Sequence, residues 1–542
     1  RGARHDAASF TASRFFIMRL ARPCTMRCIA THRHLPPITA RNSPFSSFKR
    51  RHSILVSGSA SGQILHADTG LSFWGGVDPT TGIIIDVHHP LHGECITGKV
   101  LAIPQSRGSC TGSQIILELL LAGTAPSAIL LRERDEIVPL GAIVAEEMFS
   151  ITPPPIVCLG ADGFAQLAAG GFASVDADGR VLVSESPSDN LSIGGRLISS
   201  VADASALAAE TPEVQLSGED EAMLRGDRGI AAQVAMRVVT RCARLQDATE
   251  LVHVTQAHID SCIHVGPASL AFAERFVEWS GKVMVPTTLN AVSVDLRQWE
   301  RLGVLESEGK PASALAAAYL ALGASESFTC APYLLDGAPL HGEHIGWSES
   351  NAVVFANACL GARTQKYADL LDVCIALTGR APLAGCHTDK GRLARLHLHV
   401  DTNNLYTGLL DETFFGSLGY LCGLEAEGHV PLITGLEEVP ITRDQLKAFS
   451  AAFGTSSAAA LFHIHGHTPE AEAAHRHIVL LRKTCSGEGI ESRTLTSEGI
   501  SGAYGTLGGG RASWQPPSSS SSSSAGVAAA AAASSTSVQL VA

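Results

Sequence analysis

One segment constrains the fold of this chain more than any other. An apolar stretch at residues 100–104 is followed by a turn, RGSCTGS at residues 107–113, and then by a second apolar stretch at residues 115–121. A strand, a tight turn and a helix in this order direct free backbone N–H groups and the positive end of the helix dipole towards the turn. The segment therefore predicts an anion site in an α/β domain, with a phosphate loop or a plain helix cap as the simpler interpretation.

Two side chains of this turn suit chemistry on an anion. Arg107 carries a planar fork of donors that matches a carboxylate. Ser109 carries a hydroxyl, which in a positive field loses its proton more easily than in water. We therefore regard Ser109 and Arg107 as candidate catalytic residues.

Composition narrows the class of protein. The chain has 542 residues, of which 45% are apolar and 17% charged, so it has the length for about two to four domains and can build a large core. The net charge of −12 and the lack of a basic stripe argue against a nucleic-acid partner. No apolar run reaches the roughly 18 residues that span a bilayer, so no membrane partner is expected. The 13 scattered cysteines fit a reducing compartment.

The chain divides into four parts. Residues 1–52 are rich in Arg and Ser with Asp6 as the only acid, typical of a transit peptide or of a leader that is not translated, and the expected location is cytoplasmic or mitochondrial. Residues 53–205 predict a small β/α domain. Residues 211–480 alternate strands and helices, which predicts a larger α/β domain with parallel sheets. Residues 486–542 run into Gly, Ser and Ala repeats, so we expect both ends to be disordered.

Local patterns predict individual elements inside these domains. Strands are expected at residues 53–56, 83–87, 128–131, 156–159, 181–183, 251–254 and 283–286. Helices are expected at residues 217–244, 268–279 and 313–322.

Four polar loops follow apolar segments, at residues 255–262, 287–290, 328–333 and 349–352. In α/β sheets, ligands bind beyond the carboxyl ends of the strands, so these loops together predict a site, although ordinary helix capping would also explain each one. Cys330 lies in the third loop, where a thiolate could bind iron or zinc. Cys374 and Cys422 lie in helix-like apolar runs and are interpreted as structural.

Histidines form three clusters that offer an alternative, a zinc site. The clusters are residues 463, 465 and 467, residues 397 and 399, and residues 88, 89 and 92. Histidines two apart share a face of a strand. None of the clusters has the H-E-x-x-H spacing of a helical zinc motif.

Taken together, the motifs resemble the aconitase X family. The resemblance to its small swivelling domain is carried by residues 72–78, 88–93 and 107–113. The resemblance to its large domain is carried by residues 255–262, 285–290, 328–335, 346–357 and 377–382. The order, with the small domain first and the large domain fused behind it, is similar to the single-chain branch, which contains cis-3-hydroxy-L-proline dehydratases. The two-subunit branch contains mevalonate 5-phosphate dehydratases.

The resemblance implies a β-elimination of water from a small hydroxy acid at an iron–sulfur cluster, [2Fe-2S] or [4Fe-4S], that acts as Lewis acid. The product would be Δ1-pyrroline-2-carboxylate. By the same resemblance Ser109 would be the proton acceptor and Arg107 would hold the substrate carboxylate. The other roles that the resemblance implies are substrate contacts at Ser261, Cys262, Ile263, Asn290 and Ala291, and a cluster ligand at Cys330.

The chain departs from the family in its cysteines. The family's large domain continues further and brings more cysteine ligands, whereas here only Cys485 follows Cys422. One thiolate does not hold a cluster that takes three. Either Cys262, Cys359 or Cys386 substitutes, or the 3′ end of the reading frame is wrong, or the product is inactive. The open alternatives are a mevalonate 5-phosphate dehydratase, a non-catalytic remnant that binds a carboxylate, and a zinc hydrolase built on the histidines.

Overall fold

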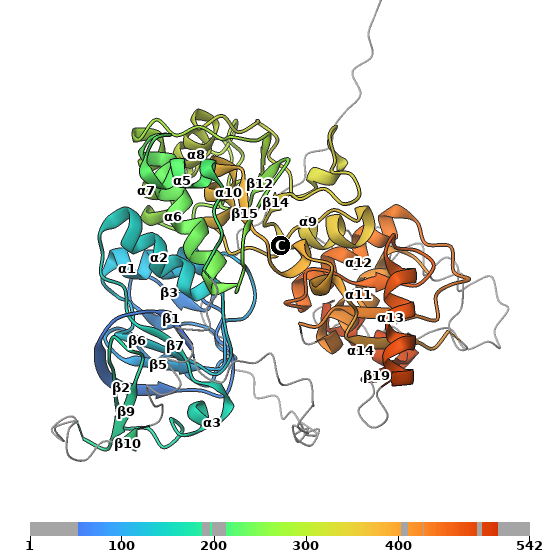
Figure 1. Cartoon of the computed structure of the whole chain (residues 1–542), viewed down its shortest axis with the longest axis horizontal. Helices are drawn as coiled ribbons and strands as arrows, with labels where there is room; N and C mark the ends of the chain where they lie inside the picture. The colour runs from blue at the N-terminus through green and yellow to red at the C-terminus, as the bar shows by residue number, and fades with distance from the viewer. Residues whose placement is uncertain are drawn as a thin grey trace, which may run out of the picture. The chain divides into compact units, whose positions relative to one another are not determined.

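The computed structural model describes residues 53–186, 196–197, 213–402, 410–426, 428–484 and 490–507 (Figure 1). The predictions for residues 1–52, for most of the linker after residue 186 and for residues 508–542 lie outside this part of the chain. None of the helices in the described part is long and apolar enough to span a membrane.

The N-terminal lobe is built on one eight-stranded sheet, in the order β1-β7-β6-β5-β2-β8-β9-β10. Its centre is parallel, from β2 through β5 and β6 to β7, and its edges are antiparallel. The central strands β5 and β6 consist of buried apolar residues because both of their faces are covered. The strands are β1 Ser53–Val56, β2 Ala60–His66, β5 Val100–Ile103, β6 Ala128–Leu131, β7 Ile156–Cys158, β8 Phe172–Val175, β9 Val181–Ser184 and β10 Arg196–Leu197.

Helices α1 (Gly112–Ala122), α2 (Ile137–Phe149) and α3 (Gly160–Ala165) accompany this sheet, together with the short hairpin of β3 (Val77–Asp78) and β4 (Ile83–Ile84). The strand predicted at residues 83–87 is therefore wrong beyond Ile84. The N–H groups of Ile85 and Asp86 both donate to the carbonyl of Gly76, which turns the chain away from its partner strand.

The central lobe alternates helices with three short parallel strands in the order β13-β12-β14. Strands β11 and β15 form a separate two-stranded antiparallel ribbon. The elements are α5 Gly218–Arg225, α6 Ile230–Leu245, β11 Leu251–His253, β12 Ala257–Ile259, α7 Pro267–Glu278, β13 Thr287–Leu289, α8 Glu306–Ala321, η2 Pro332–Leu334, β14 Gly346–Trp347, α9 Ser350–Phe355, η3 Ala356–Leu360, α10 Leu371–Thr378, β15 Arg380–Pro382, η4 Gly385–His387 and η5 Lys390–Arg392.

Several boundaries in this lobe differ from the sequence prediction. The predicted loops 255–262 and 287–290 contain β12 and β13, and the strand predicted at residues 283–286 does not form. The reason is register: Thr287–Leu289 pairs with Ala257–Ile259, whereas Pro286 has no N–H to donate to a ladder. The single helix predicted at residues 217–244 is two helices, because Gly226 and Gly229 both take positive φ angles, +88° and +90°.

The C-terminal lobe has a four-stranded parallel sheet in the order β18-β17-β16-β19. Its elements are β16 Leu396–Val400, α11 Glu412–Ala426, β17 Pro431–Thr434, α12 Arg443–Ser456, β18 His463–Ile464, α13 Ala471–Thr484, β19 Ser492–Leu495 and α14 Ser497–Leu507. The low-complexity tail predicted from residue 486 is thus wrong for residues 490–507. They complete the sheet edge and bury Leu495 and Ile500.

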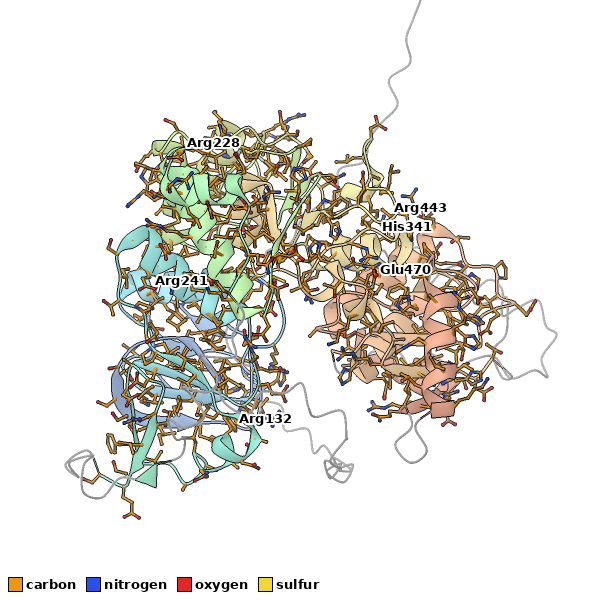
Figure 2. All side chains as sticks on the ribbon, viewed as in Figure 1. Arg132, Arg228, Arg241, His341, Arg443 and Glu470 are labelled. Carbon is orange, nitrogen blue, oxygen red and sulfur yellow. The ribbon has the colours of Figure 1, made fainter. Side chains whose placement is uncertain are left out.

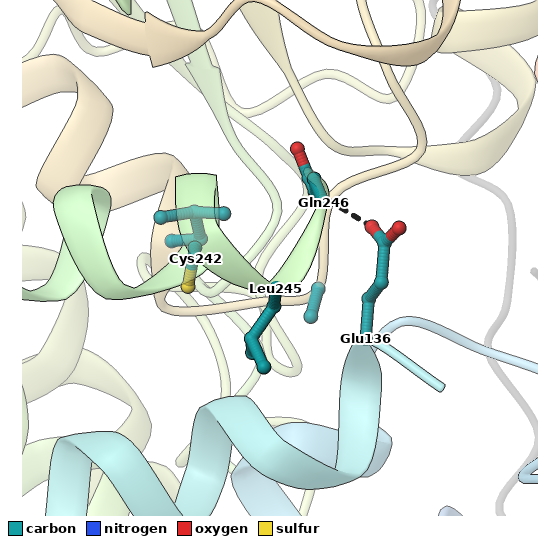
Figure 3. Close-up of a pocket in the computed structure, with 6 residues that line it drawn as sticks. Glu136, Cys242, Leu245 and Gln246 are labelled. Carbon is teal, nitrogen blue, oxygen red and sulfur yellow. Dashed lines mark hydrogen bonds between the residues drawn. The ribbon is translucent and has the colours of Figure 1, made fainter. Parts of the chain in front are cut away.

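Buried apolar side chains from α1 and α2 form one continuous core with those of α6, α7 and α10, so the N-terminal and central lobes share a core. Polar contacts reinforce it. Arg241 of α6, labelled in Figure 2, pairs with Glu146 and Glu147 of α2 at 2.6 and 2.9 Å. The small cavity between α2 and α6 is lined by Glu136, Cys242 and Gln246, among others, and its volume of about 10 Å³ has room for a single water molecule (Figure 3).

Candidate active site

The three parallel strands of the central lobe end at one edge, and each is followed by polar residues. Asp260 and Ser261 follow β12, Asn290 follows β13, and Ser348 and Glu349 follow β14. All five residues are buried. Three of the four loops that the sequence singled out therefore supply side chains to the same place, which is where an α/β sheet binds ligands.

Asp372, in the first turn of α10, organises this edge. Its Oδ2 accepts hydrogen bonds from the N–H groups of Asp260 (2.7 Å) and Ser261 (3.1 Å) and from the hydroxyl of Ser348 (2.8 Å). Its Oδ1 accepts from the hydroxyl of Ser261 (2.7 Å) and the N–H of Val373 (2.8 Å). Five donors and the helix N-terminus make Asp372 the carboxyl group best able to keep a negative charge here.

Asp369 joins the central lobe to the N-terminal lobe. Gln114 of α1 donates to its Oδ2 at 2.8 Å, Ser113 donates to its carbonyl at 2.8 Å, and its own N–H donates to the carbonyl of Cys110 at 3.2 Å. Its Oδ1 is buried without a hydrogen-bond partner. Burial, with the charge of Asp372 second, raises the pKa of Asp369 to about 7. Asp369 is therefore a group that holds or releases a proton near neutral pH.

The residue after Asp369 is strained. Leu370 has a φ of +79°, a region that side chains rarely adopt. Its N–H donates to the hydroxyl of Ser261 at 2.7 Å and its side chain is fully buried, and these contacts hold the conformation. Strain of this kind is typical of sites where geometry serves function.

Four carboxyl groups crowd this edge: Asp260, Glu349, Asp369 and Asp372. Burial raises the pKa of each of them, and the charges of Asp369 and Glu349 raise that of Asp260 further. Asn290 donates a hydrogen bond to Asp260 Oδ1. Carboxyl groups so close cannot all ionise, so they share protons as a set.

One cation opposes this charge. Lys366 lowers the pKa of Glu349, although burial remains the larger effect. Its ammonium group donates to the carbonyls of Gly454 (2.9 Å) and Ser457 (3.2 Å) in the C-terminal lobe. Lys366 therefore links the edge that carries Asp260, Glu349, Asp369 and Asp372, here called the acidic edge, to α12. Its one positive charge does not balance four carboxyl groups.

The loop of residues 107–113 meets this edge through Thr111. The hydroxyl groups of Ser109 and Thr111 are 2.9 Å apart, and the Thr111 hydroxyl in turn lowers the pKa of Asp369. Ser109 is therefore one hydrogen bond away from a hydroxyl that lowers the pKa of Asp369. The expectation of free N–H groups at this turn is wrong for Gly112 and Ser113, which donate to the carbonyls of Ser109 and Cys110.

The sequence predicted that Arg107 holds a substrate carboxylate, but in the structure Arg107 has a partner within the protein. Its guanidinium group pairs with Asp86 at 2.5 Å, and its side chain is 47% exposed. The contact lies within the N-terminal lobe. A substrate carboxylate would have to share or displace Asp86.

The other predicted substrate contacts surround the acidic edge. The hydroxyl of Ser261 is engaged with Asp372 and Leu370, and Cys262 is fully buried with its thiol donating to a backbone carbonyl at 3.1 Å. Ile263 is half-buried, and Ala291 is exposed with its N–H on the Asn290 side chain at 2.7 Å. Their roles in substrate binding stay predictions.

Cys330, the predicted cluster ligand, lies beside the acidic edge. Cys330 is exposed, but desolvation by the protein atoms around it and the charges of Glu349 and Asp260 raise the pKa of its thiol. Of the cysteines proposed as substitutes, Cys262 is buried as described, and burial raises the pKa of Cys359 to about 12 and that of Cys386 to about 11. Because iron–sulfur clusters take three or four thiolates, the donor set of the described residues does not fit a cluster.

Sequence reasoning missed Asp369, Asp372 and Gln114. A signal existed for Asp369 and Asp372, since acidic residues directly before an apolar run mark a helix N-terminus. Nothing local pointed to Gln114, which lies 255 positions away from its partner Asp369.

Comparison with known proteins identifies the family to which this architecture belongs. Three family profiles match consecutive parts of the chain: the aconitase X swivel domain at residues 49–183, the first domain at residues 213–390 and the second domain at residues 394–495. Fold and matches define a multidomain α/β protein in which a swivel domain is fused to a larger domain, as the sequence predicted. The chain belongs to the aconitase X family, and that prediction is confirmed.

Its curated relatives are dehydratases. The chain is 54% identical over 417 residues to a cis-3-hydroxy-L-proline dehydratase of Pseudomonas aeruginosa, covering 77% of this chain and 69% of that protein. It is 45% identical to the enzyme of the same name from Hypocrea jecorina, covering 77% and 68%. It is 32% identical to the phosphomevalonate dehydratase large subunit of Methanothermobacter thermautotrophicus, covering 48% and 63%. The crystal structure of the holo-form of Thermococcus kodakaraensis aconitase X is 28% identical, with a TM-score of 0.47, and the match covers 54% of this chain and 70% of that one.

Proposed function

We propose that this chain is a hydro-lyase that removes water from cis-3-hydroxy-L-proline and forms Δ1-pyrroline-2-carboxylate. Two relatives that carry this activity in their names are 54% and 45% identical to it over 77% of the chain. The observation that carries the proposal is the buried acidic edge of Asp260, Glu349, Asp369 and Asp372, which the Ser109 loop meets through Thr111.

The charge of the site favours an amino acid over a phosphorylated acid. Hydroxyproline carries an ammonium group, which the ionised members of this set of carboxyl groups attract. The phosphate of phosphomevalonate carries two negative charges, which the same groups repel, and Lys366 is already engaged with backbone carbonyls. The lower identity to phosphomevalonate dehydratases points the same way.

In the reaction the C2–H and C3–O bonds break, a C2=C3 double bond forms, water leaves, and the enamine product tautomerises to the imine. Ser109 accepts the C2 proton while its own hydroxyl proton passes by way of the Thr111 hydroxyl to the carboxylate of Asp369. Asp369, with a pKa of about 7, supplies a proton to the departing hydroxide. Arg107 holds the substrate carboxylate by displacing Asp86.

The family to which the chain belongs implies an iron–sulfur cluster, for which Cys330 would be one ligand. The other two thiols near Asp260, those of Cys110 and Cys262, are fully buried, and no three cysteines of the described residues converge. The steps above therefore use protein groups only.

The test is turnover of cis-3-hydroxy-L-proline in D2O by the full chain, reconstituted anaerobically with iron and sulfide and followed by NMR. We expect Ser109→Ala to lower the rate by about two to four orders of magnitude, whereas Ser106→Ala in the same loop leaves it unchanged. An unchanged rate in Ser109→Ala overturns the assignment of the base. Turnover of 5-phosphomevalonate in place of hydroxyproline overturns the substrate, and binding of the amino acid without turnover or iron supports a non-catalytic remnant.

A further inference from the structure

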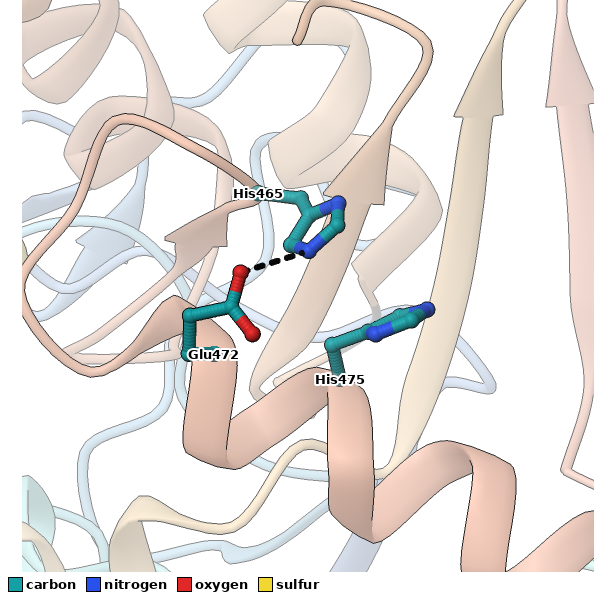
Figure 4. A group of neighbouring side chains, drawn as sticks. All are labelled: His465, Glu472 and His475. Carbon is teal, nitrogen blue, oxygen red and sulfur yellow. Dashed lines mark hydrogen bonds and ion pairs between the residues drawn. The ribbon is translucent and has the colours of Figure 1, made fainter.

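A second group of ligand-type side chains lies in the C-terminal lobe, apart in sequence from the acidic edge. One ligand atom from each of His465, Glu472 and His475 lies within 4.8 Å of the others. Figure 4 shows the three side chains beside one another. Among the described residues this is the one such group of three. The three residues belong to the loop after β18 and to the first turns of α13.

The position of this group of three residues in the fold is one at which ligands bind. His465 directly follows β18, and Glu437 follows the neighbouring parallel strand β17. The group therefore lies beyond the carboxyl ends of parallel strands, where α/β sheets bind ligands. Glu472 and His475 are three residues apart on one helix, which places both side chains on the same face of α13.

The hydrogen bonds of His465 prepare it to coordinate a metal. Glu437 accepts from Nδ1 of His465 at 3.1 Å, and Nε2 of His465 faces Glu472 at 3.1 Å. A carboxylate on one ring nitrogen fixes the tautomer and leaves the other nitrogen as the ligand, an arrangement common around bound zinc. The imidazole ring of His475 stacks on that of His465, with centroids 4.3 Å apart and an angle of 28° between the ring planes.

Nearby histidines have other partners. His397 Nε2 and His399 Nδ1 both bond to the hydroxyl of Thr434, at 2.9 and 3.0 Å, and Arg482 donates to His397 Nδ1 at 2.7 Å. His467 Nε2 donates to the Leu436 carbonyl at 2.8 Å. These histidines therefore do not meet at one point as clusters. Instead, His465 from one cluster lies beside Glu472 and His475 of α13.

We propose that His465, Glu472 and His475 bind a divalent transition metal ion, with zinc as the best match, and that Glu437 positions His465. Two imidazoles and one carboxylate form a three-ligand zinc set that leaves a fourth position for water. Calcium and magnesium take oxygen ligands and do not fit two nitrogens. Arg476, 3.9 Å from the second oxygen of Glu472, is exposed and can turn away. This site is independent of the proposed dehydratase activity.

The experiment titrates the chelator-treated full chain with zinc by calorimetry and with cobalt by visible absorption. A Cys330→Ser background removes the thiol of the acidic edge. We expect one site with the strong d–d bands of tetrahedral cobalt and without thiolate charge-transfer bands. His475→Ala should lower zinc affinity at least tenfold, and Glu437→Gln by about 10- to 100-fold.

The matched control is His477→Ala, on the same helix outside the group, which should keep the affinity of the parent. Zinc should also raise the unfolding temperature of the parent and of His477→Ala, but not that of His475→Ala. Circular dichroism identifies a variant that fails to fold, in which case Glu472→Gln takes its place. Equal zinc affinity in the parent and in folded His475→Ala or Glu472→Gln overturns the proposal, as does absence of binding in the parent.

Discussion

Asp369→Asn should stabilise the protein at high pH, although it removes a group of the proposed catalytic path. Burial raises the pKa of Asp369 to about 7 in the folded chain, compared with an ordinary value of 3.8. The folded state therefore keeps this proton over a range in which the unfolded chain has released it. Because the folded state binds more protons there, stability falls as pH rises from about 4 to about 7.

The size of the effect follows from the two pKa values. The full difference corresponds to about 4 kcal/mol, of which about 2 kcal/mol is lost between pH 5 and pH 7. Asparagine has the same shape and still accepts the hydrogen bond from Gln114, but it carries no charge to bury. The variant should therefore gain a few kcal/mol over the parent at about pH 8 and little at about pH 4. Asp260 and Glu349 titrate in the same direction, so some pH dependence should remain.

The assay is urea unfolding, followed by tryptophan fluorescence at about pH 5 and about pH 8. The exposed Asp336→Asn is the control and should leave the pH dependence of the parent unchanged. In the dehydratase assay, Asp369→Asn should lose most of its activity, because an amide does not deliver a proton. Stability of Asp369→Asn that follows the parent at every pH would refute the reasoning from burial.

Three further variants probe buried polar contacts, two at the acidic edge and one between Arg392 and Glu470. Gln114→Ala removes the donor to Asp369 from the N-terminal lobe and should cost about 1 to 3 kcal/mol, measured by urea unfolding at pH 7. Ser261→Ala removes both an acceptor and a donor at the acidic edge, so we expect a loss of about 2 kcal/mol and faster amide exchange near Leu370. Arg392→Lys replaces a buried guanidinium that pairs with Glu470, labelled in Figure 2, at 2.7 Å, and should lower the free energy of unfolding by about 3 kcal/mol. A change under about 0.5 kcal/mol in any of them would contradict the role given to that contact.

The sequence located many elements because their signals are local. Ala128–Leu131 is apolar throughout and flanked by turn residues, and it forms a strand with the predicted bounds. The helix of residues 268–279 is off by one residue at each end, at Pro267–Glu278. The strand predicted at residues 283–286 is wrong. Val283 and Val285 favour strands locally, but the residues that pair are set by the partner strand, which pairs with Thr287–Leu289 instead.

The site was predictable in part. Polar residues after strands mark Asp260, Asn290 and Glu349 as candidates, because the carboxyl ends of parallel strands meet at one edge. That Glu349 and Asp260 also face Cys330 depends on how the loop of residues 328–333 folds back. Likewise, His465 and His475 become neighbours only when α13 packs beside β18.

The sequence by itself determined the family, the order of the lobes and most of the strands and helices. Tertiary structure decided the proton affinities and the partners of the functional groups. An aspartate such as Asp369 has an ordinary pKa in an extended chain. In the folded chain its pKa reaches about 7 because packing removes water and brings the charge of Asp372 close, although the hydrogen bond from Gln114 acts in the opposite direction. Desolvation and charge–charge energies depend on distances in space, which no local pattern of residues contains.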